Sequence, residues 1–206
     1  PPPPRSTGVR GSMLRRGGRG WGRRGVVDRP LRIGGIGSGR AHPQWDDWAY
    51  SVGRGIAQAG AVLVCGGLSG VMTAASRGAR EAGGTVLGIL PGTAPGEANP
   101  DITIPIPTGL GEGRNLLVVH SSDALIAIGG GAGTLSEIGF SLKLHKPLVL
   151  LGSWQIELPD GADPLPRPPQ VVQTAEEAVR LALSLVAYPG EHFKKTAGVL
   201  GTEGKG

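Results

Sequence analysis

Three glycine-rich turns each follow an apolar run and precede a segment of helical periodicity. They read Gly34-Gly-Ile-Gly-Ser-Gly39, Cys65-Gly-Gly-Leu-Ser-Gly-Val-Met72 and Gly129-Gly-Gly-Ala-Gly-Thr-Leu-Ser-Glu137. Turns of this kind bring the backbone N–H groups of a helix N-terminus against a negatively charged ligand. Three such turns at one sheet edge predict a nucleotide or phosphate site.

The residues expected to bind this ligand are glycines, hydroxyl side chains and one methionine of the three turns. They are Gly37, Ser38, Gly39, Gly66, Gly67, Ser69, Gly70, Met72, Gly130, Gly131, Gly133 and Thr134. Each of the two serines is equally compatible with a helix N-cap, and Met72 with core packing.

Two charged residues, Arg114 and Glu137, complete the candidate site, and each has a purely structural alternative. Arg114 lies near a predicted helix start, where the macrodipole favours anions, so an anionic partner is expected. That partner is either the ligand or the carboxylate of Glu112 or Glu137. The segment Thr134-Leu-Ser-Glu137 also matches a capping box, with Thr134 as the N-cap. Sequence alone leaves these alternatives open.

The elements that must position these residues alternate between short apolar runs and helical patterns. This alternation predicts a Rossmann-like, doubly wound α/β fold, whose mainly parallel sheet of six to seven strands has helices on both faces. The expected strands are 31–36, 61–65, 85–90, 102–106, 124–128 and 147–151, with a short seventh near Val171 and Val172. The expected helices are 45–59, 70–82, 113–121, 134–144 and 174–186.

Composition divides the 206 residues into one domain and two tails. Residues 1–30 hold eight arginines and one acid, so the formal charge of +5 conceals a net charge of −2 in the remainder. This Arg/Gly-rich segment is predicted to be a disordered tail, and nucleic acid is a partner only if the tail is a genuine part of the protein. Residues 31–188 form the predicted nucleotide-binding domain, and 189–206 a flexible C-terminal tail.

Several other classes of protein fit the sequence poorly. No apolar run is long enough for a membrane span or a signal peptide. The single cysteine, Cys65, excludes an internal disulfide. A cytoplasmic location without membrane contact is therefore expected. The four histidines have no metal-ligand spacing with Cys65, so no metal is expected. The first turn lacks the full dinucleotide fingerprint, and the chain contains no Gly-Lys-Ser/Thr phosphate loop.

The sequence resembles a Rossmann-like group often labelled lysine decarboxylases, of SLOG type. The group includes the LOG (lonely guy) phosphoribohydrolases and the molybdenum cofactor carrier proteins. The LOG signature Pro-Gly-Gly-x-Gly-Thr-x-x-Glu corresponds to Gly129–Glu137, and the helix opening Met-x-x-Arg-Lys corresponds to Gly111-Glu-Gly-Arg114-Asn115. Gly129 replaces the proline and Asn115 the lysine, and these two departures are more similar to the carrier branch.

The resemblance implies two functions. One is hydrolysis of the N-glycosidic bond of a nucleoside 5′-monophosphate. In that reaction the resemblance implies that Glu137 stabilises the oxocarbenium-like state or activates water. It also implies that Arg114 orients the substrate and that Asn115 lies beside Arg114 in the site. The alternative is a non-catalytic carrier that binds a nucleotide or the molybdenum cofactor. In either case the resemblance implies a small phosphorylated ligand, no further required cofactor, and a homodimer.

Overall fold

The computed structural model describes residues 29–187. The two predicted tails lie outside these residues, except for Arg29 and Pro30. The Arg29 guanidinium forms an ion pair with Asp123 at 2.7 Å, so the contacts of the domain extend to this residue.

Within this range, seven parallel strands form one sheet in the order β4-β3-β2-β1-β5-β6-β7. The strands are β1 (Arg32–Gly37), β2 (Val62–Cys65), β3 (Val86–Leu90), β4 (Ile104–Pro107), β5 (Ala124–Ile128), β6 (Leu148–Leu151) and β7 (Gln170–Val172). The predicted α/β fold is confirmed, and so is the short seventh strand. The strand order reverses between β1 and β5, because the chain continues from β1 to β2 on one side and from β5 to β6 on the other. The carboxyl ends of β1 and β5 therefore form the topological switch point, which is where ligands bind in such sheets.

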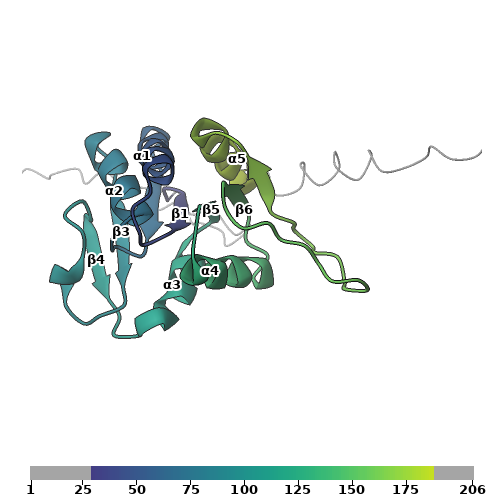
Figure 1. The fold of residues 1–206 in the computed structure, drawn as a ribbon. Helices are drawn as coiled ribbons and strands as arrows, with labels where there is room; N and C mark the ends of the chain where they lie inside the picture. Colours follow the sequence, from purple (N-terminus) through teal and green to yellow (C-terminus); the bar gives the residue numbers. More distant parts are fainter. Residues whose placement is uncertain (1–28, 188–206) are drawn as a thin grey trace, which may run out of the picture.

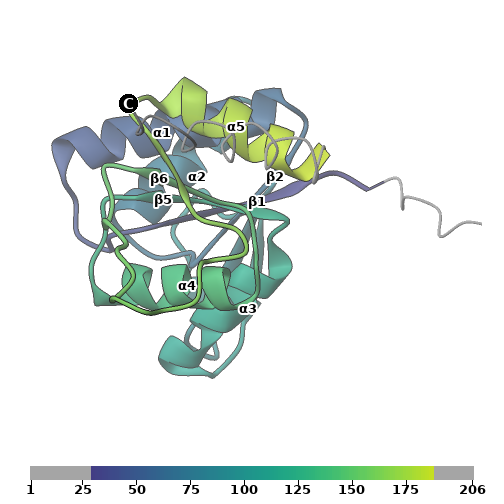
Figure 2. The same ribbon diagram turned by 90° about the vertical axis from the view of Figure 1, so that its right-hand side faces the viewer.

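Five α-helices of the described chain cover the two faces of the sheet (Figures 1 and 2). One face carries α1 (Pro43–Gln58), α2 (Val71–Glu81) and α5 (Ala175–Ala187), and the other carries α3 (Arg114–Ser121) and α4 (Ala132–Lys143). Two short 3₁₀ helices, η1 (Pro95–Glu97) and η2 (Gly111–Gly113), lie in the connections. None of the helices within residues 29–187 has both the length and the apolar character of a membrane span.

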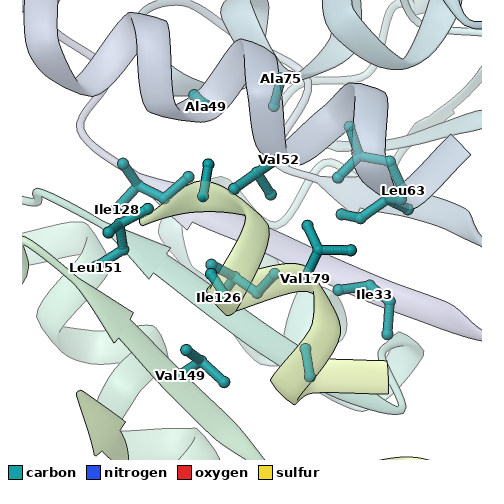
Figure 3. Packing of buried hydrophobic residues seen from close by; sticks show 14 of the residues in the cluster. Ile33, Ala49, Val52, Leu63, Ala75, Ile126, Ile128, Val149, Leu151 and Val179 are labelled. Atoms are coloured by element: carbon teal, nitrogen blue, oxygen red, sulfur yellow. The ribbon is translucent and has the colours of Figure 1, made fainter. Parts of the chain in front are cut away.

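The core consists of two apolar layers, one on each face of the sheet. Val52 of α1 and Val179 of α5 pack against Ile126 and Leu151 in the larger layer (Figure 3). The inner strands are buried on both faces, which explains their continuous apolar runs in the sequence, whereas the edge strands β4 and β7 are partly exposed. Packing on both sides fixes the strand ends rigidly, and the glycine turns start from those ends.

One predicted helix boundary is wrong in a way that changes the site. The helix expected to start at Thr134 begins at Ala132, and its N-cap is Gly131 in an extended conformation without a side-chain cap. The first helical hydrogen bond runs from the Leu135 N–H to the Gly131 carbonyl at 3.0 Å. Thr134 is therefore inside the first turn, and the capping box with Glu137 does not exist.

Candidate functional site

The three glycine turns meet at the carboxyl edge of the sheet, and hydrogen bonds join the first two. The Val71 N–H donates to the Ser38 carbonyl at 3.0 Å, and the Ser69 hydroxyl donates to the Gly39 carbonyl at 2.7 Å. Ser38 is not a helix cap either, because its hydroxyl accepts from the Arg40 N–H at 3.0 Å in the turn. The turns after β1 and β2 thus form one unit above the switch point.

A deep cavity of about 260 Å³ opens inside this unit. Most of the residues predicted from the sequence line it: Gly37, Gly39, Gly66, Met72, Arg114, Asn115, Gly133, Thr134 and Glu137. It adjoins a larger cavity of about 670 Å³, which Ser38, Gly130 and Gly131 line together with the first turn of α4. Because the two cavities share Gly37, Gly39, Gly133 and Thr134, they form one cleft.

Three residues predicted to bind the ligand line neither cavity and instead support the turns. Gly67 has a positive φ of 74° and packs against Leu90, and its carbonyl accepts from the Asn99 N–H at 2.8 Å. Gly70 has a positive φ of 63° and lies against the Ser38 carbonyl, while Ser69 bridges to Gly39. The sequence pattern marks the turns correctly, but it does not separate the residues that face the cleft from those that brace it.

Arg114 is the buried cation of the cleft. Its side chain starts where η2 passes into α3, is 7% exposed, and lies with its guanidinium against the backbone of Gly66. A Cβ at position 66 would occupy the space of that guanidinium, so any other residue there would require the Arg114 side chain to move. Among residues 29–187, no carboxylate comes within ion-pair distance of Arg114, and its buried Nε has no hydrogen-bond partner. The alternative partner of Arg114, a salt bridge to Glu112 or Glu137, is therefore absent from the described residues.

Glu137 enters the same cavity from α4 and is 6% exposed. Burial raises the pKa of its carboxyl to about 8, an effect that the positive charge of Arg114 opposes and the negative charge of Glu112 reinforces. At neutral pH the carboxyl is therefore mostly protonated and can donate a hydrogen bond to an anion. This state suits ligand binding better than deprotonation of water.

Asn115 and the first turn of α4 supply neutral polar groups to the cleft. The Asn115 side-chain amide donates to the Ser136 hydroxyl at 2.9 Å, which donates in turn to the Gly133 carbonyl at 2.7 Å. This chain of hydrogen bonds ties α3 to the start of α4. The first N–H groups of a helix lack partners within it, so those of the residues lining the cleft are available to a phosphate.

Some lining residues were not predicted from the sequence. Arg40, His42 and Trp45 line the larger cavity, and Glu112 the deeper one. The His42 and Trp45 rings stack with centroids 4.3 Å apart. Arg40 and His42 lie just beyond the first glycine turn, and this position in the sequence could have indicated them. Cys65 is fully buried beside Ser76, as expected for a core residue.

These features define a Rossmann-like α/β protein of LOG-like fold, with a polar cleft at the carboxyl ends of β1 and β5. The model of the SLOG cluster4 family matches residues 30–180. The chain therefore belongs to the SLOG cluster4 family.

Relatives and solved structures agree with this assignment. An uncharacterized protein of Archaeoglobus fulgidus is 44% identical over 139 residues, which cover 64% of this chain and 91% of that protein. The molybdenum cofactor binding protein of Rippkaea orientalis has a TM-score of 0.69 and 36% identity, covering 77% of this chain and 99% of the other. The molybdenum cofactor carrier protein of Chlamydomonas reinhardtii has a TM-score of 0.67, with the same identity and coverage.

Proposed function

We propose that this protein binds and carries a small phosphorylated cofactor of the molybdenum cofactor type. The observation that supports this most is Arg114, a buried guanidinium that faces the cleft without a counter-ion among residues 29–187. A buried cation is stable only with a partner, and a phosphate supplies two charge-assisted hydrogen bonds to a guanidinium. The choice of cargo rests on the likeness to the two molybdenum cofactor proteins.

The cargo is expected to lie with its phosphate between Arg114 and the first turn of α4. The N–H groups there and the protonated Glu137 carboxyl would donate to phosphate oxygens, and Asn115 would add its polar side chain. The ring of the cargo would occupy the larger cavity, which has room for it beside the stacked His42 and Trp45. No bond is made or broken in this function.

Retention of the cofactor through gel filtration tests the proposal. The purified protein is mixed with the molybdenum cofactor without oxygen and separated from the free ligand, and the bound pterin is quantified by its fluorescence after oxidation. Wild type should retain about one equivalent and Arg114→Gln at least tenfold less, whereas Arg80→Gln, an exposed control on α2, should retain it fully. Absence of retention by wild type would contradict the proposal.

Phosphoribohydrolase activity is a second candidate, because Arg114 and Glu137 line the same cavity. In that reaction water replaces the base of a nucleoside 5′-monophosphate, and free base and ribose 5-phosphate are released. An ionised Glu137 would stabilise the oxocarbenium-like state, so the rate should rise as the pH approaches 8. Incubation with a panel of monophosphates, followed by chromatography for free base, tests this. Release by wild type but not by Glu137→Gln supports an enzyme, and no release excludes it for those substrates.

We also propose that the protein acts as a homodimer in the cytoplasm, as the resemblance to LOG-like proteins suggests. Light scattering during gel filtration should then give twice the chain mass of 21.0 kDa. A mass equal to one chain at micromolar concentration would contradict the dimer.

A further inference from the structure

The cleft does not end at the larger cavity but continues past the ends of β5 and β6. A third cavity of about 350 Å³ lies there, open to solvent, and includes Gly152, Ser153 and Trp154 in its lining. It shares Trp45 and Gly130 with the larger cavity, so the two are contiguous. Three compartments thus follow one another along the carboxyl edge of the sheet.

The floor of this third compartment is built from two glycines backed by two tryptophans. Gly129 and Gly152 follow β5 and β6, and both have a φ of 56°, in the left-handed region that favours glycine. A Cβ on either would collide with an α1 indole, that of Trp45 at Gly129 and that of Trp48 at Gly152. The Ser153 hydroxyl donates to the Gly129 carbonyl at 2.5 Å and joins the two turns. The floor is therefore held in place by α1 behind it and by the hydrogen bond between its two turns.

The wall of the compartment carries a large aromatic side chain without an evident packing role. Trp154 is 41% exposed, although tryptophan is usually well buried. It stands next to the Ser153 that fixes the floor, so the start of its loop is anchored. An exposed indole that lines an open cavity is a surface on which an aromatic ring can stack.

We propose that this compartment binds the base of a nucleotide joined through a pyrophosphate to the ring held in the rest of the cleft. The inference rests on the carrier function proposed above. Gly130 borders both the larger cavity and the third compartment, and it precedes the first turn of α4. A pyrophosphate along that turn would therefore lie beside the ring in the larger cavity, with one phosphate toward Arg114 and the base in the third compartment. The ligand class is a pyrophosphate-linked dinucleotide or its pterin equivalent.

This arrangement differs from the dinucleotide fingerprint that the sequence lacks. That fingerprint relies on an acidic residue about 20 positions after the first glycine turn. In this chain the second ring would instead be recognised beyond β5 and β6, by stacking on Trp154. The absence of the fingerprint therefore does not argue against a dinucleotide at this site.

Calorimetric titration with matched pairs of probes tests the inference. The pairs are guanosine diphosphate with diguanosine 5′,5′-pyrophosphate, and the two adenosine equivalents, so that only the second nucleoside differs within a pair. The molybdenum cofactor is titrated in parallel. Wild type should bind at least one dinucleotide about tenfold more tightly than its diphosphate, which is within the range that base–aromatic stacking supplies.

Variants of the loop that follows β6 test whether the tighter binding of the dinucleotide depends on Trp154. Trp154→Ala should abolish the preference for the dinucleotide while binding of the diphosphate stays unchanged, and Trp154→Phe should restore part of it. Leu158→Ala, at another exposed apolar residue of the same loop, should behave as wild type. Circular dichroism checks that each variant is folded.

The outcomes separate this inference from the proposed function. If the molybdenum cofactor binds but no dinucleotide is preferred, or the preference survives in Trp154→Ala, the second subsite is refuted and the carrier function stands. If the cofactor binds and no nucleotide does, the subsite is likewise refuted. If neither cofactor nor nucleotides bind, both proposals fail.

Discussion

Replacing Glu137 by glutamine should stabilise the protein, and the gain should grow with pH. The pKa of the buried carboxyl is about 8 in the folded chain against an ordinary 4.5. The folded state therefore holds this proton more tightly than the unfolded state. Its stability is full below pH 4.5, falls as the pH rises, and levels off above pH 8. Glutamine has the same shape but does not ionise, so it removes this loss.

The size of the effect follows from 1.36 kcal/mol for each pH unit between the two pKa values. The free energy of unfolding of Glu137→Gln should exceed that of wild type by less than about 1 kcal/mol at pH 5. The excess should reach about 3 kcal/mol at pH 7 and about 5 kcal/mol at pH 9. Relaxation around the ionised carboxylate and entry of water would reduce these figures but leave their order unchanged.

Urea denaturation followed by circular dichroism at the three pH values measures this difference. Glu157→Gln, at an exposed position of the loop after β6, is the matched control and should follow wild type at every pH. A Glu137→Gln variant that is no more stable than wild type at pH 9 would refute the reasoning, and so would a difference that does not change between pH 5 and pH 9.

Three further predictions concern the turns, the opposite edge of the sheet and the N-terminal segment. Gly66→Ala should displace the Arg114 guanidinium, lower cofactor retention at least tenfold, and lower the free energy of unfolding in urea by about 1–3 kcal/mol. Gly139→Ala is the control, because a Cβ there meets no atom within 4 Å, and it should have none of these effects. At Asp123, burial opposes ionisation, but hydrogen bonds from Arg29 and Arg32 outweigh it and hold its pKa well below the usual range. Asp123→Asn should therefore destabilise the chain by about 1–2 kcal/mol at pH 7, and the difference should shrink as the pH falls below 4; an equal loss at pH 3 would contradict this. Deletion of residues 1–28 should remove any binding to single-stranded DNA that weakens between 50 and 200 mM salt, as measured by fluorescence polarisation, and unchanged binding would contradict a role for that segment.

Strand positions could be predicted well from the sequence because strands buried on both faces leave continuous apolar runs. The prediction for residues 124–128 matches β5 at both ends. The start of α4 could not be predicted in the same way. Gly131 and Gly133 are poor helix formers, so propensity placed the start after the last glycine, at Thr134. In the fold, the helix starts at Ala132 and takes Gly133 into its first turn.

The same boundary decides what could be predicted about Glu137. A helix starting at Thr134 makes Glu137 a partner of the cap, whereas a start at Ala132 turns its side chain into the cleft. Trp154 could not have been found from the sequence at all. Its loop has no periodicity, and its role depends on the distant glycines and tryptophans that build the floor beside it.

Arg114 and Glu137 together indicate how binding and stability are coupled in this fold. A buried guanidinium without a counter-ion and a carboxyl that resists ionisation both lower the stability of the ligand-free protein. A phosphate would satisfy Arg114 and accept a hydrogen bond from the protonated Glu137, so it would reverse both losses at once. Binding should therefore raise the free energy of unfolding at neutral pH, and this gain should shrink above pH 8, where an ionised Glu137 would repel the phosphate.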